Sequence, residues 1–130
     1  MTLPELLERT VNEFNGRRYM EAAAAAREGG LLAPAGRDAL FWSGLQEACV
    51  GFALLVERKH GQAEVKMVAA IEKLRNFGYL YQDIEVTSVL AGLRLGVEEI
   101  RKIREKRKSQ FDMSLLPSFR LVARAKAQDR

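Results

Sequence analysis

The sequence predicts an all-α fold: a compact bundle of five or six helices around a central apolar helix at about residues 37–60. The composition supports this, because alanine, leucine, glutamate and arginine dominate and only three prolines are present. Residues 48–56 are apolar on every side, which is typical of a helix surrounded by other helices. No segment shows the alternation of polar and apolar residues that is typical of a half-buried strand.

Two helices are predicted before the central one. Thr2 is a suitable N-cap and Glu5 completes a capping box, so the first helix begins there and ends at residues 15–16. The second helix spans about residues 17–28 and is expected to stop at the two glycines 29–30. It carries five consecutive alanines, which bury little area but let another helix approach closely.

The central helix has a strip of small residues that could match these alanines: Gly44, Ala48 and Gly51. The helix is expected to end at Gly61. His60, the only histidine of the chain, would then lie beside the helix end, where an imidazole interacts well with the helix dipole.

Two further helices and a tail are predicted in the second half of the chain. A fourth helix covers about residues 62–76, and Asp83 is a good N-cap for a long fifth helix with a continuous apolar stripe. After a break, a short sixth helix is predicted at 119–128. The expected division is a helical bundle domain, 1–108, and a basic C-terminal extension, 109–130, packed on the bundle or on a partner subunit.

Positive charge is concentrated towards the C-terminus. Residues 1–100 carry 11 Lys/Arg and 14 Asp/Glu, whereas residues 101–130 carry 10 Lys/Arg against three acidic residues. Six closely spaced cations form a basic run: Arg101, Lys102, Arg104, Lys106, Arg107 and Lys108. Around a helix they suit phosphate contacts without sequence readout, although no aromatic residues are interleaved to stack on single strands. The alternatives are an ordinary solvated helix end and a site for an acidic protein or membrane surface.

Three stretches of the chain resemble domain-of-unknown-function family 309, small helical proteins of bacteria and archaea. Residues 14–22, Phe-Asn-Gly-Arg-Arg-Tyr-Met-Glu-Ala, resemble the first sequence motif of that family. Residues 41–48 are similar to its next helix, and residues 59–74 look like the helix after that. The resemblance covers about residues 3–100 and leaves the basic tail outside.

The family is recognised by a His-x-x-x-Glu-x-x-Trp motif that has been suspected of binding metal. On this chain its three positions are Ala23, Arg27 and Gly30, so the resemblance implies a divergent member that lacks the motif. The glutamine of the facing helix falls near Glu47, another departure. A methyl group donates no electron pair and Arg27 would repel a cation, so we expect no metal and no cofactor.

Catalytic chemistry has little support in the residues. Nucleophilic triads need an activating partner, and the chain has one histidine and one cysteine, Cys49, within an apolar run typical of a buried thiol. A Gly-rich phosphate loop is also missing. The first residues lack the pattern of a signal peptide, and no stretch approaches about 20 apolar residues, so we expect a cytoplasmic protein without membrane insertion.

The sequence therefore favours a non-catalytic interaction or structural module. The segment 111–127 carries apolar side chains that we expect to be buried against the bundle or against a second copy of the chain. Self-association as a homodimer is therefore one expectation. Nucleic acid or another polyanion could bind the basic run, although this is not favoured. A second alternative is an enzyme or small-molecule binder with a remodelled pocket near four residues: Tyr19, Arg27, Trp42 and Glu47.

Overall fold

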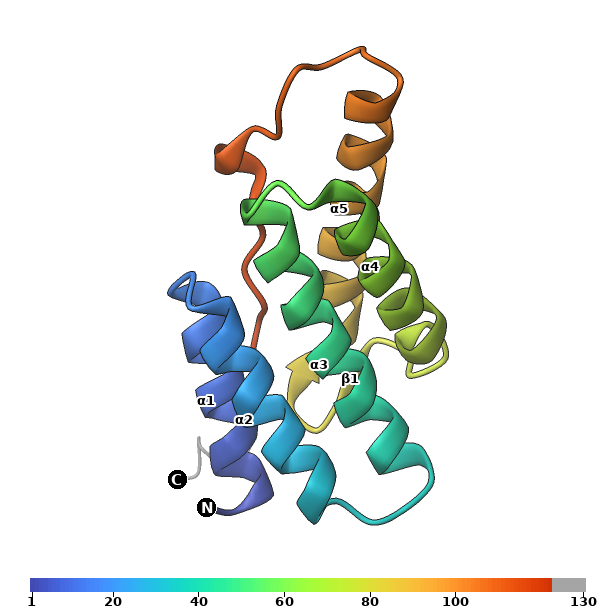
Figure 1. The fold of residues 1–130 in the computed structure, drawn as a ribbon. Coiled ribbons are helices and arrows are strands. Elements are labelled where there is room, and N and C mark those ends of the chain that lie inside the picture. The colour runs from blue at the N-terminus through green and yellow to red at the C-terminus, as the bar shows by residue number, and fades with distance from the viewer. Residues whose placement is uncertain (123–130) are drawn as a thin grey trace.

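A computed structural model describes residues 1–122, which form five α-helices, a short 3-10 helix and one small hairpin (Figure 1). The elements in chain order are α1 (Leu3–Asn15), α2 (Tyr19–Leu32), α3 (Arg37–Val56), α4 (His60–Leu74), β1 (Leu80–Tyr81), β2 (Ile84–Glu85), α5 (Val86–Arg104) and η1 (Met113–Leu115). The predicted all-α class is confirmed. The hairpin was missed because each of its strands is only two residues long.

Helices that follow one another in the chain are neighbours in space. α1 packs on α2, α2 on α3, α3 on α4 and α4 on α5, and α3 also contacts α5. The predicted central helix is confirmed, since half of α3 is buried and its aromatic residues reach the middle of the core. Because neighbours are joined by short connections, the chain forms the bundle mainly from local pairings.

α3 is also long and apolar enough to cross a membrane by length and composition. The expectation that no stretch approaches this length was therefore wrong. The most apolar stretch of α3 is 56% buried inside the bundle, and the core helix of a soluble protein passes the same test. Its apolar character is explained here by contacts with other helices.

The first two helices differ in how well the sequence located their ends. The capping box at the start of α1 is confirmed: Thr2 Oγ1 accepts from the Glu5 N–H, and Glu5 Oε1 accepts from the Thr2 N–H. In contrast, α2 does not stop at residues 29–30 but continues to Leu32. Gly29 is required there for packing, since a Cβ atom on it would lie 2.4 Å from carbon atoms of the Trp42 ring.

Three helices end in the same hydrogen-bonded turn with a cationic residue in the left-handed conformation. These residues are Arg17 after α1, Arg58 after α3 and Lys106 after α5, with φ of 67°, 64° and 64°. In each turn the backbone N–H of the residue after the left-handed one donates to the carbonyl five residues earlier, which is the pattern of a Schellman motif. Glycine is the usual residue at that position, so Gly61 was predicted to end α3. This prediction was wrong, because α3 ends at Val56 and Arg58 takes the left-handed position. His60 instead begins α4.

The small residues of α3 face α4 rather than the alanines of α2. A Cβ atom on Gly44 would meet Leu74, and one on Gly51 would meet Met67, and both of these partners lie on α4. The predicted match with the alanine run was therefore wrong for the two glycines. The alanines Ala22, Ala23, Ala25 and Ala26 are buried nevertheless, because α2 lies between α1 and α3.

The hairpin precedes α5 and changes the expected start of that helix. β1 and β2 pair antiparallel with Tyr81 opposite Ile84, and the two turn residues Gln82 and Asp83 both have positive φ. Two such residues form the tight hairpin turn that is normally built from Asn-Gly. Asp83 is therefore a turn residue and not the predicted N-cap, which is Glu85.

After α5 the chain turns back over the bundle as a largely extended segment. We call residues 111–122 the strap; Figure 1 shows it in orange and red, running from the far end of α5 back towards the hairpin. Phe111 and Phe119 are buried, so the strap packs on the bundle. The predicted sixth helix is wrong for residues 119–122, which are not helical, and its remainder, 123–128, lies outside the described residues.

Candidate functional site

The four residues of the predicted remodelled pocket are not brought together. Tyr19 and Trp42 are core residues, and Arg27 is exposed on α2. The Glu47 carboxylate forms an ion pair with Lys73 Nζ on α4 at 2.9 Å. Glu47 is therefore paired with a residue of α4 and not with Arg27 of α2.

The single cysteine and the described carboxylates do not form a reactive or metal-binding group. Cys49 is completely buried, and burial raises the pKa of its thiol far above the ordinary value. Within residues 1–122, no three His, Cys, Asp or Glu side chains lie together in a way that could hold a metal ion. Of the three family-motif positions, Ala23 is buried, Gly30 is half-buried and Arg27 faces solvent.

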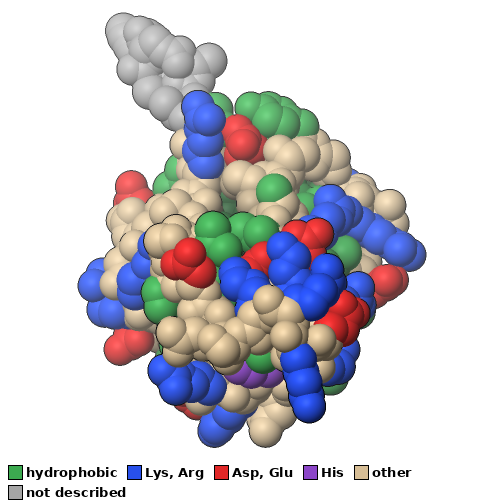
Figure 2. Space-filling view, turned by 90° about the horizontal axis from the view of Figure 1, so that it is seen from above, with side chains coloured by type: hydrophobic (Ala, Val, Ile, Leu, Met, Phe, Trp, Pro, Cys, Tyr) green, Lys and Arg blue, Asp and Glu red, His purple; other side chains and the backbone are tan. Residues whose placement is uncertain are grey.

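Five of the six cations of the basic run contact carboxylates of the same chain, but they share these carboxylates. Glu64 on α4 forms ion pairs with Arg101, at 3.0 Å, and with Arg104. Glu99 forms ion pairs with Lys102, at 3.0 Å, and with Lys108. Figure 2 shows cationic side chains interleaved with red carboxylates at this end of the bundle rather than forming an unbroken basic patch.

Arg107 pairs with Glu105 at 2.6 Å. Lys106 is the one member of the run that forms no ion pair with the described part of the chain. Because Glu64 and Glu99 each pair with two cations, the carboxylates reduce the positive charge of the run without cancelling it, and exposed pairs of this kind are weak. Polyanion binding through the run stays a prediction.

Glu99 is a buried member of this network, only 3% exposed. Hydrogen bonds from Lys108 and Lys102 lower the pKa of its carboxyl group. Lys108 lies in the connection between α5 and the strap, so its bond to Glu99 fixes that connection to the helix.

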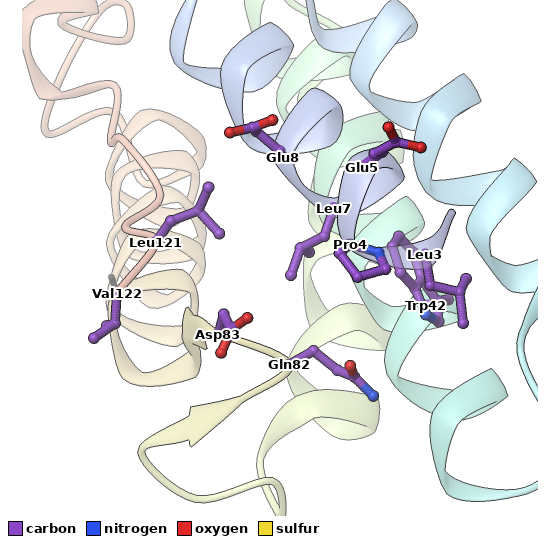
Figure 3. A pocket seen from close by; sticks show the side chains of 10 residues that line it. All are labelled: Leu3, Pro4, Glu5, Leu7, Glu8, Trp42, Gln82, Asp83, Leu121 and Val122. Carbon is purple, nitrogen blue, oxygen red and sulfur yellow. The ribbon is translucent and has the colours of Figure 1, made fainter. Parts of the chain in front are cut away.

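A cavity of about 480 Å³ lies where the start of α1 faces the hairpin turn and the end of the strap. In Figure 3 Glu5 and Glu8 extend from α1, Gln82 and Asp83 from the hairpin turn, and Leu121 and Val122 from the strap. Trp42 also lines it, and its buried indole N–H has no hydrogen-bond partner among the described residues. Nothing in the sequence indicated this cavity, because its walls include a hairpin and an extended end of the strap, and neither was predicted.

The strap itself lies in a site built from three elements, which we call the strap groove. The groove consists of the end of α1, the middle of α5 and the hairpin. Asn15 at the end of α1 is its most specific part: its amide Nδ2 donates to the Phe119 carbonyl at 3.0 Å, and its Oδ1 accepts from the Phe119 N–H at 2.7 Å. One side chain therefore satisfies both backbone groups of one strap residue.

Arg17 binds the strap two residues further back. Its guanidinium donates from Nη1 to the Pro117 carbonyl at 2.9 Å and from Nη2 to the Leu116 carbonyl at 3.3 Å. The left-handed conformation of Arg17 at the end of α1 turns the chain here, so the same residue ends the helix and holds the strap.

The apolar side of the groove is formed by close contacts. The ring of Phe119 stacks on Phe14, with centroids 3.6 Å apart and an angle of 9° between the planes. Pro117 lies directly on the backbone of α5, since a Cβ atom on Gly92 would be 2.8 Å from it. A side chain at position 92 would therefore close the groove.

The hairpin completes the groove by pairing with the end of the strap. The Glu85 N–H donates to the Arg120 carbonyl and the Val122 N–H donates to the Asp83 carbonyl, both at 2.8 Å. Ile84 and Leu121 thereby form an antiparallel bridge. Extended chains bound through their main-chain groups, with pockets for alternate side chains, are a common mode of peptide recognition.

Sequence reasoning missed the groove residues because Asn15 was interpreted only as the end of the first helix and Arg17 only as the start of the second. The available signal was the apolar content of the strap itself, which indicated a segment needing a binding surface. No protein-family model, no curated protein and no solved structure matches this chain. The resemblance to domain-of-unknown-function family 309 therefore stays a sequence prediction.

Proposed function

We propose that this protein is a non-catalytic helical interaction module whose binding surface is the strap groove. The observation that carries the proposal is the way Asn15 and Arg17 bind the backbone, rather than the side chains, of residues 116–119. Contacts to the backbone do not depend on which side chains the bound segment carries. Such a surface can therefore accept an extended segment supplied by another chain.

The apolar contacts give the groove its selectivity. A segment that fits needs a proline against Gly92 and, two residues later, an aromatic ring against Phe14. An apolar residue opposite Ile84 completes the match. The expected ligand is thus an extended peptide of the form Pro-x-Phe-x-Leu, as in the strap itself.

The test uses a fluorescent peptide with the sequence of residues 111–122, added to the full-length chain and followed by fluorescence anisotropy. In the wild type the covalently attached strap competes at high local concentration, so binding is weak. Phe119→Ala and Leu121→Ala weaken the attached strap and leave the groove intact, so both variants should bind the peptide more tightly. Circular dichroism checks that the helices remain folded.

Substitutions in the groove, in contrast, should not increase binding of the added peptide. Asn15→Ala and Arg17→Ala also weaken the attached strap, but they remove donors that the added peptide needs, so peptide binding should not increase. A peptide in which alanine replaces the residue equivalent to Phe119 is the ligand control. If the strap-side variants bind no better than the wild type, or if the groove-side variants bind equally well, the proposed function is wrong.

A further inference from the structure

We propose that two copies of this chain exchange their straps, so that the strap of each copy lies in the groove of the other. This inference rests on the proposed function, because it names the source of the extended segment as a second copy. Every strap contact would be kept in such a dimer, and only the connection at residues 105–110 would change. Exchange of an identical element is a low-cost route to a symmetric dimer.

The connection contains a locally unfavourable backbone conformation in the closed monomer, and it is the one such position of the described residues that lies between the bundle and the strap. Lys106 holds a φ of 64° at the position of the Schellman turn where glycine fits best. Left-handed backbone is costly for a residue with a Cβ atom. Strained hinges of a few residues favour exchange, because opening relieves the strain in both copies.

The sequence of the connection also favours a different conformation. Residues 104–108, Arg-Glu-Lys-Arg-Lys, are all strong helix formers, yet the chain leaves the helix at Glu105. If α5 continued through this stretch, the strap would project away from its own groove. In the closed form, where the strap lies in its own groove, α5 must end at Arg104 against this helical preference. The closed form is stabilised by the strap contacts and by the bond between Lys108 and Glu99.

Exchange must overcome the high local concentration of an attached strap, so it is expected to increase with protein concentration. The balance between the two forms then depends on position 106. Lys106→Gly removes the strain of the closed turn and also disfavours a continued helix. Both effects favour the monomer, and two hinges change in each dimer, so the association constant should fall by at least about tenfold.

The test reports directly which copy supplies the strap. Glu85 and Arg120 lie opposite each other next to the Ile84–Leu121 bridge, within the separation that a disulfide spans. The double variant E85C/R120C is refolded at several protein concentrations, oxidised and run on a non-reducing gel. A strap in its own groove gives an intramolecular disulfide, whereas exchange gives a covalent dimer. Cys49 does not interfere, because it is buried.

We expect a covalent dimer whose fraction rises with concentration and falls when Lys106→Gly is added. Arg58→Gly is the matched control, because Arg58 occupies the same position of the same turn after α3, away from the strap. It should leave the dimer fraction unchanged. An equal fall in both glycine variants would overturn the role of the hinge.

Exclusively intramolecular disulfides at every concentration would overturn exchange itself. The same holds if light scattering detects a dimer while the disulfides remain intramolecular, because the copies would then associate through another surface. Neither result touches the proposed function, which is decided by binding of the added peptide. Peptide binding without exchange would leave the groove as a site for a different protein.

Discussion

The α2–α3 interface and the strap groove both bury aromatic rings, but different forces hold them. At the α2–α3 interface Trp42 lies on the bare backbone of Gly29, and the contact is made by shape alone. In the strap groove Phe119 stacks on Phe14, but two polar side chains also bind the strap backbone. Both arrangements bury apolar area, yet only the second uses groups that could bind the same segment from another molecule.

The difference suggests a division of roles within the bundle. Contacts made by close approach of helices leave no space for a competing ligand and depend on the whole fold being formed. Contacts made by hydrogen bonds to an extended backbone can be released one segment at a time. We therefore expect substitutions at the α2–α3 interface to affect global stability, and substitutions at the groove to affect mainly the strap.

The largest effect is expected at Gly29. Gly29→Ala places a methyl group 2.4 Å from ring atoms of Trp42, and because both helices are fixed by other contacts, neither can move away easily. The free energy of unfolding should fall by about 2–3 kcal/mol in urea titrations, even though alanine is the better helix former.

Gly30 is the matched control in the same helix. A Cβ atom there would lie 3.5 Å from the Trp42 Cβ, which is ordinary van der Waals contact. Gly30→Ala should therefore raise the free energy of unfolding by about 0.5–1 kcal/mol. Equal effects of the two substitutions would contradict the close packing of Trp42 on α2.

A smaller and more local effect is expected at Asn15. Asn15→Ala leaves the N–H and carbonyl of Phe119 without their partner, which costs about 1–2 kcal/mol. Limited proteolysis should cut the strap faster while the helices remain protected. Ser118→Ala changes an exposed strap residue and should alter stability by less than about 0.5 kcal/mol. Equal cleavage rates in the two variants would contradict the role assigned to Asn15.

An effect no larger than that of Asn15 is expected at Glu99, and it depends on pH. Its pKa is lower in the folded protein than the ordinary 4.5, so its ionised form stabilises the fold above that value. The contribution is lost as the pH falls below about 4.5 and through the lowered pKa. Glu99→Gln should cost about 1–2 kcal/mol at neutral pH, and the difference from the wild type should shrink in acid. A difference that is constant with pH would show that the paired carboxylate is not responsible.

The sequence predicted the helices well where a local signal was sufficient. Thr2 and Glu5 determine the start of α1 through contacts three residues apart, and the apolar run at 48–56 indicated the central helix. The ends of the helices were harder to locate from the sequence. The residues in the left-handed conformation after three of the helices are Arg17, Arg58 and Lys106, and none of them is a glycine, the residue that usually marks a helix end. Gly29 was misread for the opposite reason, since its role is packing rather than ending a helix.

The groove was beyond sequence reasoning for a different physical reason. Asn15 and Phe119 are 104 residues apart, and their contact exists only after the hairpin and α5 have positioned the strap. The sequence correctly indicated that the apolar residues after the basic run need a binding surface. It could not indicate which surface, because the residues that bind the strap backbone have no pattern of their own.

Native-state hydrogen exchange of the full-length chain tests most directly whether the strap is a separately bound segment. The amides of Phe119 and Val122, which bond to Asn15 and Asp83, should exchange through a local opening at least about 2 kcal/mol below the free energy that protects the middle of α3. Asn15→Ala should lower this opening energy further and leave α3 unchanged. If the strap amides instead exchange only with global unfolding, at the same free energy as α3, the strap is an inseparable part of the core, contrary to both proposals.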